Sequence, residues 1–201
     1  MVYSWHTSAA LPTAALAFEP IFVAVVTGFA YGDLRNDAST GSIWARILER
    51  AWAVIVVDFI VNFVTELGMQ SLASADLVAR ILSVGVLIVS ISFVFADVHA
   101  VVTDDADPWP LLPLRALGAS MASAWQGLTF ARATIVFALS GPLAEFATSA
   151  IRFELARSGV AQPDLWAQAP IVVLLLPFVQ TFATFVYLDA CGVEPNRSCG
   201  E

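Results

Sequence analysis

Lysine is absent from the chain, and positive charge of any kind is scarce. The nine cationic residues are all Arg and stand against 17 Asp and Glu, which leaves a formal net charge of −8 over 201 residues. Retinal and pyridoxal phosphate attach to proteins through a lysine amine, so both chemistries are excluded. The sequence also has no basic stripe of the kind that holds nucleic acid. We therefore expect no nucleic-acid partner.

Charged residues of either sign are few. They make up 13% of the chain, whereas hydrophobic residues make up 59% and the mean hydropathy is +0.79. Soluble domains have about 25% charged and about 45–50% apolar residues. The polar stretches are too short for a separate soluble domain. We therefore predict an all-α fold, in which residues 1–201 form a single polytopic helical bundle in a lipid bilayer.

Cysteine and histidine occur only twice each. Cys191 and Cys199 flank a turn-prone segment and either form a disulfide, if this segment faces an oxidising compartment, or remain two thiols. His6 and His99 each lie near an end of a predicted span. Each is either an axial ligand to a separate pigment or haem, or a solvated surface residue.

Five stretches are long and apolar enough to cross a bilayer, whose apolar core of about 30 Å requires about 20 helical residues. They cover about residues 9–31, 51–68, 78–102, 133–151 and 165–188. Five Trp residues lie at or near the predicted ends, where such rings favour the membrane boundary: Trp5, Trp44, Trp52, Trp109 and Trp166. Between the third and fourth spans, residues 112–130 predict an amphipathic helix that lies in the interface or extends the fourth span. A sixth span is the alternative, but the turn it needs at 130–132 is very tight.

The arginines indicate an orientation. The connections on one side of the predicted bundle carry six Arg and those on the other carry three, which favours an N-terminus outside and a C-terminus inside. The opposite orientation is left open because the margin is small. The absence of Lys and the abundance of Ala, Arg and Val suggest a bacterial genome, and we expect a multi-pass protein of the inner membrane.

Ionisable residues inside the predicted spans are the strongest functional signal, because each costs about 2.5–3.5 kcal/mol to insert. The second span carries a polar stripe at four-residue spacing, interrupted only by Val54: Arg46, Arg50, Asp58, Asn62 and Glu66. Such a stripe must face protein or water. Asp58, nearest the middle, either binds a proton or cation or hydrogen-bonds a neighbouring helix.

Two further carboxyls lie within predicted spans. Glu19 precedes Pro20, which lacks an N–H and predicts a kink. Glu145 follows Gly141-Pro142 and requires a partner on another helix, with Arg46, Arg50 or Arg132 as the candidates. The candidate ion or proton pathway is therefore Glu19, Asp58, Asn62, Glu66 and Glu145. In the fifth span, by contrast, uncharged residues such as Gln180 predict hydrogen bonds between helices.

The sequence has no recognisable motif for catalysis, phosphate binding or a metal site. The acidic run at 104–107 lacks the spacing of a calcium loop and is expected to be solvated. No residues favour enzyme activity, and a membrane enzyme acting on lipid or quinone is an alternative without candidate residues. We predict no cofactor, although bound lipids or pigments are compatible with the composition.

Two functions fit these features. The first is a non-catalytic subunit that packs against other integral membrane subunits and stabilises or assembles a larger complex, of the respiratory or photosynthetic kind. This subunit is the function we predict, and the alternative is a small transporter or channel, coupled to protons or cations, that uses the carboxylates inside the membrane. In the transporter, Glu19, Asp58 and Glu145 would converge on one site.

Overall fold

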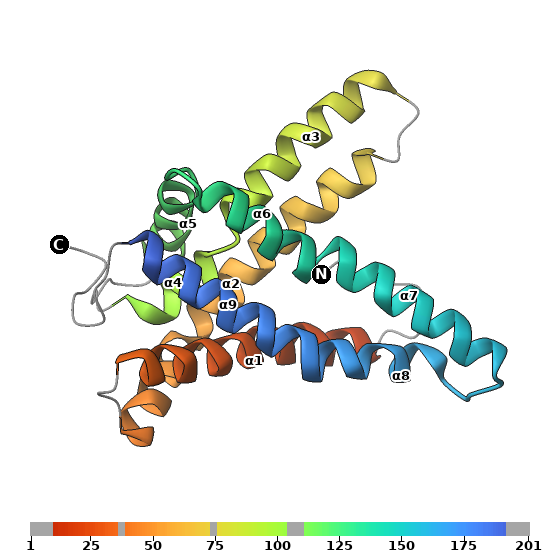
Figure 1. The fold of residues 1–201 in the computed structure, drawn as a ribbon, viewed down its shortest axis with the longest axis horizontal. Coiled ribbons are helices and arrows are strands. Elements are labelled where there is room, and N and C mark those ends of the chain that lie inside the picture. Colours follow the sequence, from red (N-terminus) through yellow and green to blue (C-terminus); the bar gives the residue numbers. More distant parts are fainter. Residues whose placement is uncertain (1–9, 36–38, 73–75, 104–110, 192–201) are drawn as a thin grey trace.

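The chain folds into helices, as the sequence predicts. The computed structural model describes residues 10–35, 39–72, 76–103 and 111–191, with no β-strand among them. The elements in order are α1 (Ala10–Arg35), α2 (Thr40–Leu72), α3 (Leu77–Ser92), α4 (Ala96–Val102), α5 (Leu111–Ala124), α6 (Thr129–Ser140), α7 (Pro142–Arg157), α8 (Pro163–Pro170), a π-helical turn (Ile171–Leu175) and α9 (Leu176–Ala190). Figure 1 shows their arrangement.

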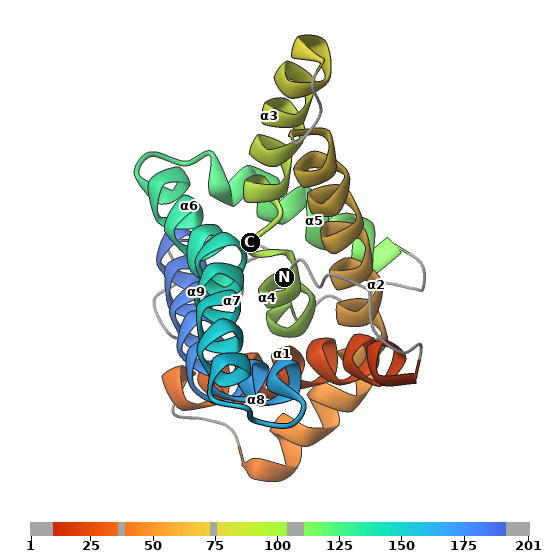
Figure 2. The same cartoon turned by 90° about the vertical axis from the view of Figure 1, so that its right-hand side faces the viewer.

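The short helix α4 lies at the centre of the fold. It packs against α1, α2, α5 and α9, and Figure 2 shows it between these helices. Every residue of α4 is buried except Asp97, which is half-buried. Small residues such as Ala96 and Ala100 allow neighbouring backbones to approach closely. A polar residue on α4 is therefore placed in the interior of the bundle.

Close packing also joins α1 to α2. A Cβ atom built on Gly28 would lie 2.7 Å from Cγ1 of Ile47, and Ile47 is only 2% exposed. The absence of a side chain at Gly28 is therefore what lets the two helices approach this closely.

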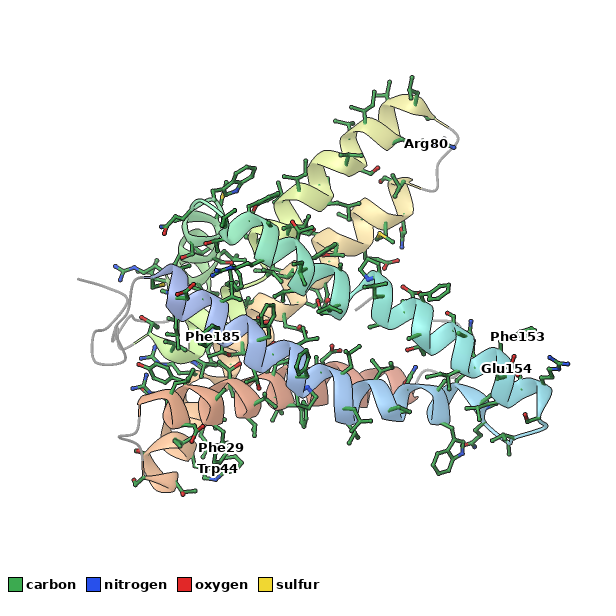
Figure 3. The ribbon with its side chains drawn as sticks, viewed as in Figure 1. Phe29, Trp44, Arg80, Phe153, Glu154 and Phe185 are labelled. Carbon is green, nitrogen blue, oxygen red and sulfur yellow. The ribbon has the colours of Figure 1, made fainter. Side chains whose placement is uncertain are left out.

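Two helical hairpins project from this core. The C-terminal half of α2 pairs with α3, and α7 pairs with α8 (Figure 1). Their outer surfaces carry large apolar side chains that no described residue covers, such as Leu82 (65% exposed) and Phe146 (74%). In Figure 3, Phe153 and Glu154 lie near the far end of α7, and Arg80 lies near the far end of α3.

Within the described residues, three helical stretches are long and apolar enough to cross a membrane. They are Leu77–Val102, Thr129–Arg157 and Trp166–Ala190, and they overlap the predicted third, fourth and fifth spans. The predicted spans 9–31 and 51–68 fall on α1 and α2, which are not among the three. These two helices carry the ionisable residues Glu19, Arg50 and Asp58.

Each of the three apolar stretches is interrupted. Between α3 and α4 the chain leaves the helix at residues 93–95, and between α6 and α7 it does so at Gly141, before Pro142. The π-helical turn ends two residues before Pro177, which cannot donate a hydrogen bond to the carbonyl of Val173. Interrupted helices of this kind are common at transport sites in membrane proteins.

Helix α5 corresponds to the predicted interfacial helix at residues 112–130 but is shorter than predicted. It ends at Ala124, and the turn before α6 contains Gly127 with φ of +49°, so this turn lies earlier in the chain than residues 130–132. The apolar side chains of Leu114 and Met121 face outward, whereas the opposite face, with Ser120, is buried. The small-residue face of α5 thus packs on the core.

Candidate functional site

Three carboxylates, one on each of α1, α2 and α4, are near enough to one another for their charges to interact. Glu19 is on α1, Asp58 is on α2, and Asp97 is in the first turn of α4. All three are half-buried, and their charges lie close enough to interact with one another. We refer to Glu19, Asp58 and Asp97 as the carboxylate cluster.

Asp97 is the most enclosed member of the cluster. Its Oδ1 atom is buried and accepts no hydrogen bond from any described residue. A buried acceptor without a partner costs about 1–3 kcal/mol. The same oxygen is therefore a natural position for a proton or another small positive ligand.

Helix α2 contributes Asp58 because its polar stripe faces the protein. Arg50 is only 9% exposed, and Asn62 hydrogen-bonds Asp58 one turn along the helix. Near one end of the stripe, Arg46 donates to the carbonyl of Val102 on α4 at 3.1 Å. At the other end Glu66 accepts a 2.6 Å hydrogen bond from Gln70.

Sequence reasoning placed Glu145 in this group, and the structure places it elsewhere. Glu145 is half-buried in the first turn of α7, and α7 packs on α6, α8 and the π-helical turn rather than on α4. Asp97 takes its place in the cluster. The signal for Asp97 was an ionisable residue inside the apolar stretch 78–102, obscured by its nearness to the end of that stretch.

One proposed partner of Glu145 is engaged elsewhere. Arg132 on α6 forms an ion pair with Asp189 on α9. A second ion pair joins Arg152 on α7 to Asp164 on α8 at 3.5 Å. The side chains in both pairs are about half exposed.

Helix α9 is tied to the core by buried hydrogen bonds. Gln180 donates to the hydroxyl of Thr27 on α1 at 2.8 Å, which agrees with the predicted bonding between helices. Nδ1 of His99 lies 2.5 Å from the hydroxyl of Tyr187. The expectation of a solvated surface histidine was wrong for His99, because it is 6% exposed; Tyr187 holds the ring inside the bundle.

Several predicted features fall outside the described residues. These are His6, Cys199 and the acidic run at 104–107, so the disulfide between Cys191 and Cys199 stays a prediction. In the part of the chain that the structure describes, no group of three or more His, Cys, Asp or Glu residues is arranged to hold a metal ion.

Comparison with known proteins gives no relative. No protein-family model matches the chain, and neither a curated protein nor a solved structure matches it. Function is therefore inferred from the carboxylate cluster and the molecular surface.

Proposed function

We propose that this protein is a small integral membrane transporter or channel that carries protons through the carboxylate cluster. The observation that supports this best is the buried, unpartnered Oδ1 of Asp97 beside two further carboxylates from other helices. A carboxylate that takes up a proton loses its charge, so protonation relieves the repulsion within the cluster. A proton needs only one acceptor atom, whereas a metal ion needs several ligands.

The fold supports a location at membrane depth. In Leu77–Val102, only 17% of the most apolar window is buried inside the protein, and lipid is the natural cover for the rest. Because α1 and α2 pack directly against α4, we propose that they also cross the bilayer, for five spans in total. We place the protein in a bacterial inner membrane.

Two exposed tryptophans, on α2 and α8, are consistent with a location in a membrane. Trp44 is 43% exposed and Trp166 is 59% exposed, and the ring of Trp44 lies edge-on to Phe29 at 5.6 Å between centroids (Figure 3). Both fit the boundary between lipid and water, where amphipathic rings are favoured.

Proton flux into proteoliposomes tests the proposal. The purified chain is reconstituted with a pH-sensitive dye inside the vesicles, and a potassium gradient with valinomycin supplies the driving force. We expect flux above that of empty vesicles and a loss of flux in Asp58→Asn. Glu145→Gln is the matched control, because it removes a half-buried carboxylate outside the cluster. Wild-type flux equal to that of empty vesicles would overturn the proposal.

A second function is favoured by a different observation. Helix α7 leaves Leu143, Phe146 and Phe153 more than half exposed, and such a surface also suits another integral membrane subunit. In this alternative the chain stabilises or assembles a larger complex. Extraction in mild detergent, followed by a native gel and mass spectrometry, distinguishes the two functions: a band far larger than a homo-oligomer favours the subunit, and migration alone favours the transporter.

A further inference from the structure

The residues between α3 and α4 do not themselves explain why the helix is interrupted there. Helix α3 ends at Ser92 and α4 begins at Ala96, and the segment between them contains neither Gly nor Pro. An interrupted helix leaves backbone N–H and carbonyl groups without their helical partners, and in an apolar environment these must be satisfied by other groups.

A single hydroxyl satisfies both sides of this interruption. Oγ of Ser120, on α5, donates to the carbonyl of Ser92 at 2.8 Å and accepts from the backbone N–H of Phe95 at 3.0 Å. Ser120 is 0% exposed. The hydroxyl therefore joins the last residue of α3 to the residue that precedes α4.

A neighbouring residue supports only one side. Nε1 of Trp125 donates to the hydroxyl of Ser92 at 3.0 Å, but this bond reaches only the α3 side of the interruption, and Trp125 is 55% exposed. Ser90, also 0% exposed, bonds only to its own helix, at the carbonyl of Val86. Of these side chains, Ser120 is the one that connects the two helices.

We propose that Ser120 is the positioning residue of the carboxylate cluster. Asp97 follows Phe95 by two residues, so the hydrogen bond that the Phe95 N–H donates to Ser120 sets where the first turn of α4 begins and where the Asp97 carboxylate lies. The inference rests on the proposed function, in which Asp97 is the residue that binds the proton. Ser120 itself touches no transported ion and acts through the backbone of α4.

The test compares hydroxyl loss at two buried serines. Ser120→Ala and the matched control Ser90→Ala are reconstituted, and their proton flux is measured. Infrared difference spectroscopy then records the carbonyl stretching band of protonated Asp97 in both variants. This band is identified by its loss in Asp97→Asn. We expect Ser120→Ala to lose flux by about tenfold or more and to shift the frequency of the Asp97 band. Ser90→Ala is expected to leave both unchanged.

A second pair of variants separates hydrogen bonding from packing. Ser120→Thr keeps the hydroxyl. Ser120→Val introduces a side chain of nearly the same shape as Thr but without the hydroxyl. Retained flux and an unshifted band in Ser120→Thr, with loss of flux in Ser120→Val, support the inference even if Ser120→Ala does not fold. Equal behaviour of the two variants overturns it.

Failure of the inference differs from failure of the proposed function. Normal flux in Asp97→Asn removes the role of Asp97 and with it both proposals. Lost flux in Asp97→Asn, together with wild-type flux and an unshifted band in Ser120→Ala, overturns only the role of Ser120.

Discussion

Helices α3 and α4 are adjacent in the chain and rich in the same apolar residues, yet their environments are opposite. In α4, Val98 and Val101 are 0% exposed, whereas in α3 Ile81 and Leu82 are 63% and 65% exposed. Hydropathy therefore identifies both as apolar without telling which one lies in the protein interior. The three-residue interruption between them marks the change from core to hairpin.

Polar side chains form different hydrogen bonds in the two regions. Around α4 they bond between helices, as His99 does with Tyr187 and Gln180 does with Thr27. Ser83 and Ser90 of α3, in contrast, bond to carbonyls of their own helix. Lipid is as apolar as a leucine side chain, so polar and packing contacts specify the core, and the hairpins need only an apolar surface.

The largest effect is expected on the hairpin. Leu82→Arg places a charge where we propose lipid contact and should cost up to about 2.5–3.5 kcal/mol of insertion free energy, the cost at the centre of a span, seen as a loss of membrane-integrated protein after carbonate extraction. Arg80→Leu is the control and should integrate normally. A fully integrated Leu82→Arg would show that this surface does not face lipid.

A pair of glycines compares packing in the two regions. Gly28→Ala brings a methyl group against Ile47 and should lower stability by about 1–3 kcal/mol. Gly85 on α3 has no atom within 4 Å of a Cβ built on it, so Gly85→Ala should leave stability unchanged or raise it slightly. Thermal unfolding in detergent measures both. Equal loss in the two variants would remove the distinction between core and hairpin.

Loss of the hydrogen bond between α9 and α1 has a smaller expected effect. Gln180→Leu leaves the hydroxyl of Thr27 without this donor, and interhelical bonds in membranes contribute about 0.6 kcal/mol on average and at most about 1.7 kcal/mol. The adjacent, exposed Thr181 supplies the control Thr181→Val. The same unfolding assay should show a decrease only in Gln180→Leu, and an unchanged midpoint would mean that this bond adds nothing.

The smallest effect is expected at the ion pair between α6 and α9. Arg132 and Asp189 have side chains that are 43% and 53% exposed, and exposed ion pairs contribute about 0–1 kcal/mol. Arg132→Gln should therefore lower the unfolding midpoint slightly at low salt and not at high salt. A large decrease that does not depend on salt would mean that this pair belongs to the core.

The composition and the polar pattern were enough to predict the helical class and the inward face of α2. The four-residue spacing of Asp58 and Asn62 places both on the side that packs against the core, because helical periodicity depends on sequence alone. The interruption at Gly141 also has a local signal in Pro142.

The rest depends on contacts between distant residues. The carbonyl of Ser92, where α3 ends, accepts a hydrogen bond from Ser120, which lies 28 residues later in the chain. No sequence pattern near Ser92 predicts that α3 ends there. For the same reason the sequence grouped Glu145 with Glu19 and Asp58, and missed Asp97. Which carboxylates share a site is decided by the order of helix packing, and periodicity does not contain that information.

Proton flux in proteoliposomes of the wild type and Asp97→Asn, measured side by side, tests the carboxylate cluster most directly. We expect the wild type to carry protons under an imposed potential and Asp97→Asn to lose about 100-fold of that flux, at the lower end of what a positioned proton-transfer group contributes. Equal flux in the two proteins, at equal reconstitution, would contradict a proton-binding role for the residue at the centre of the fold.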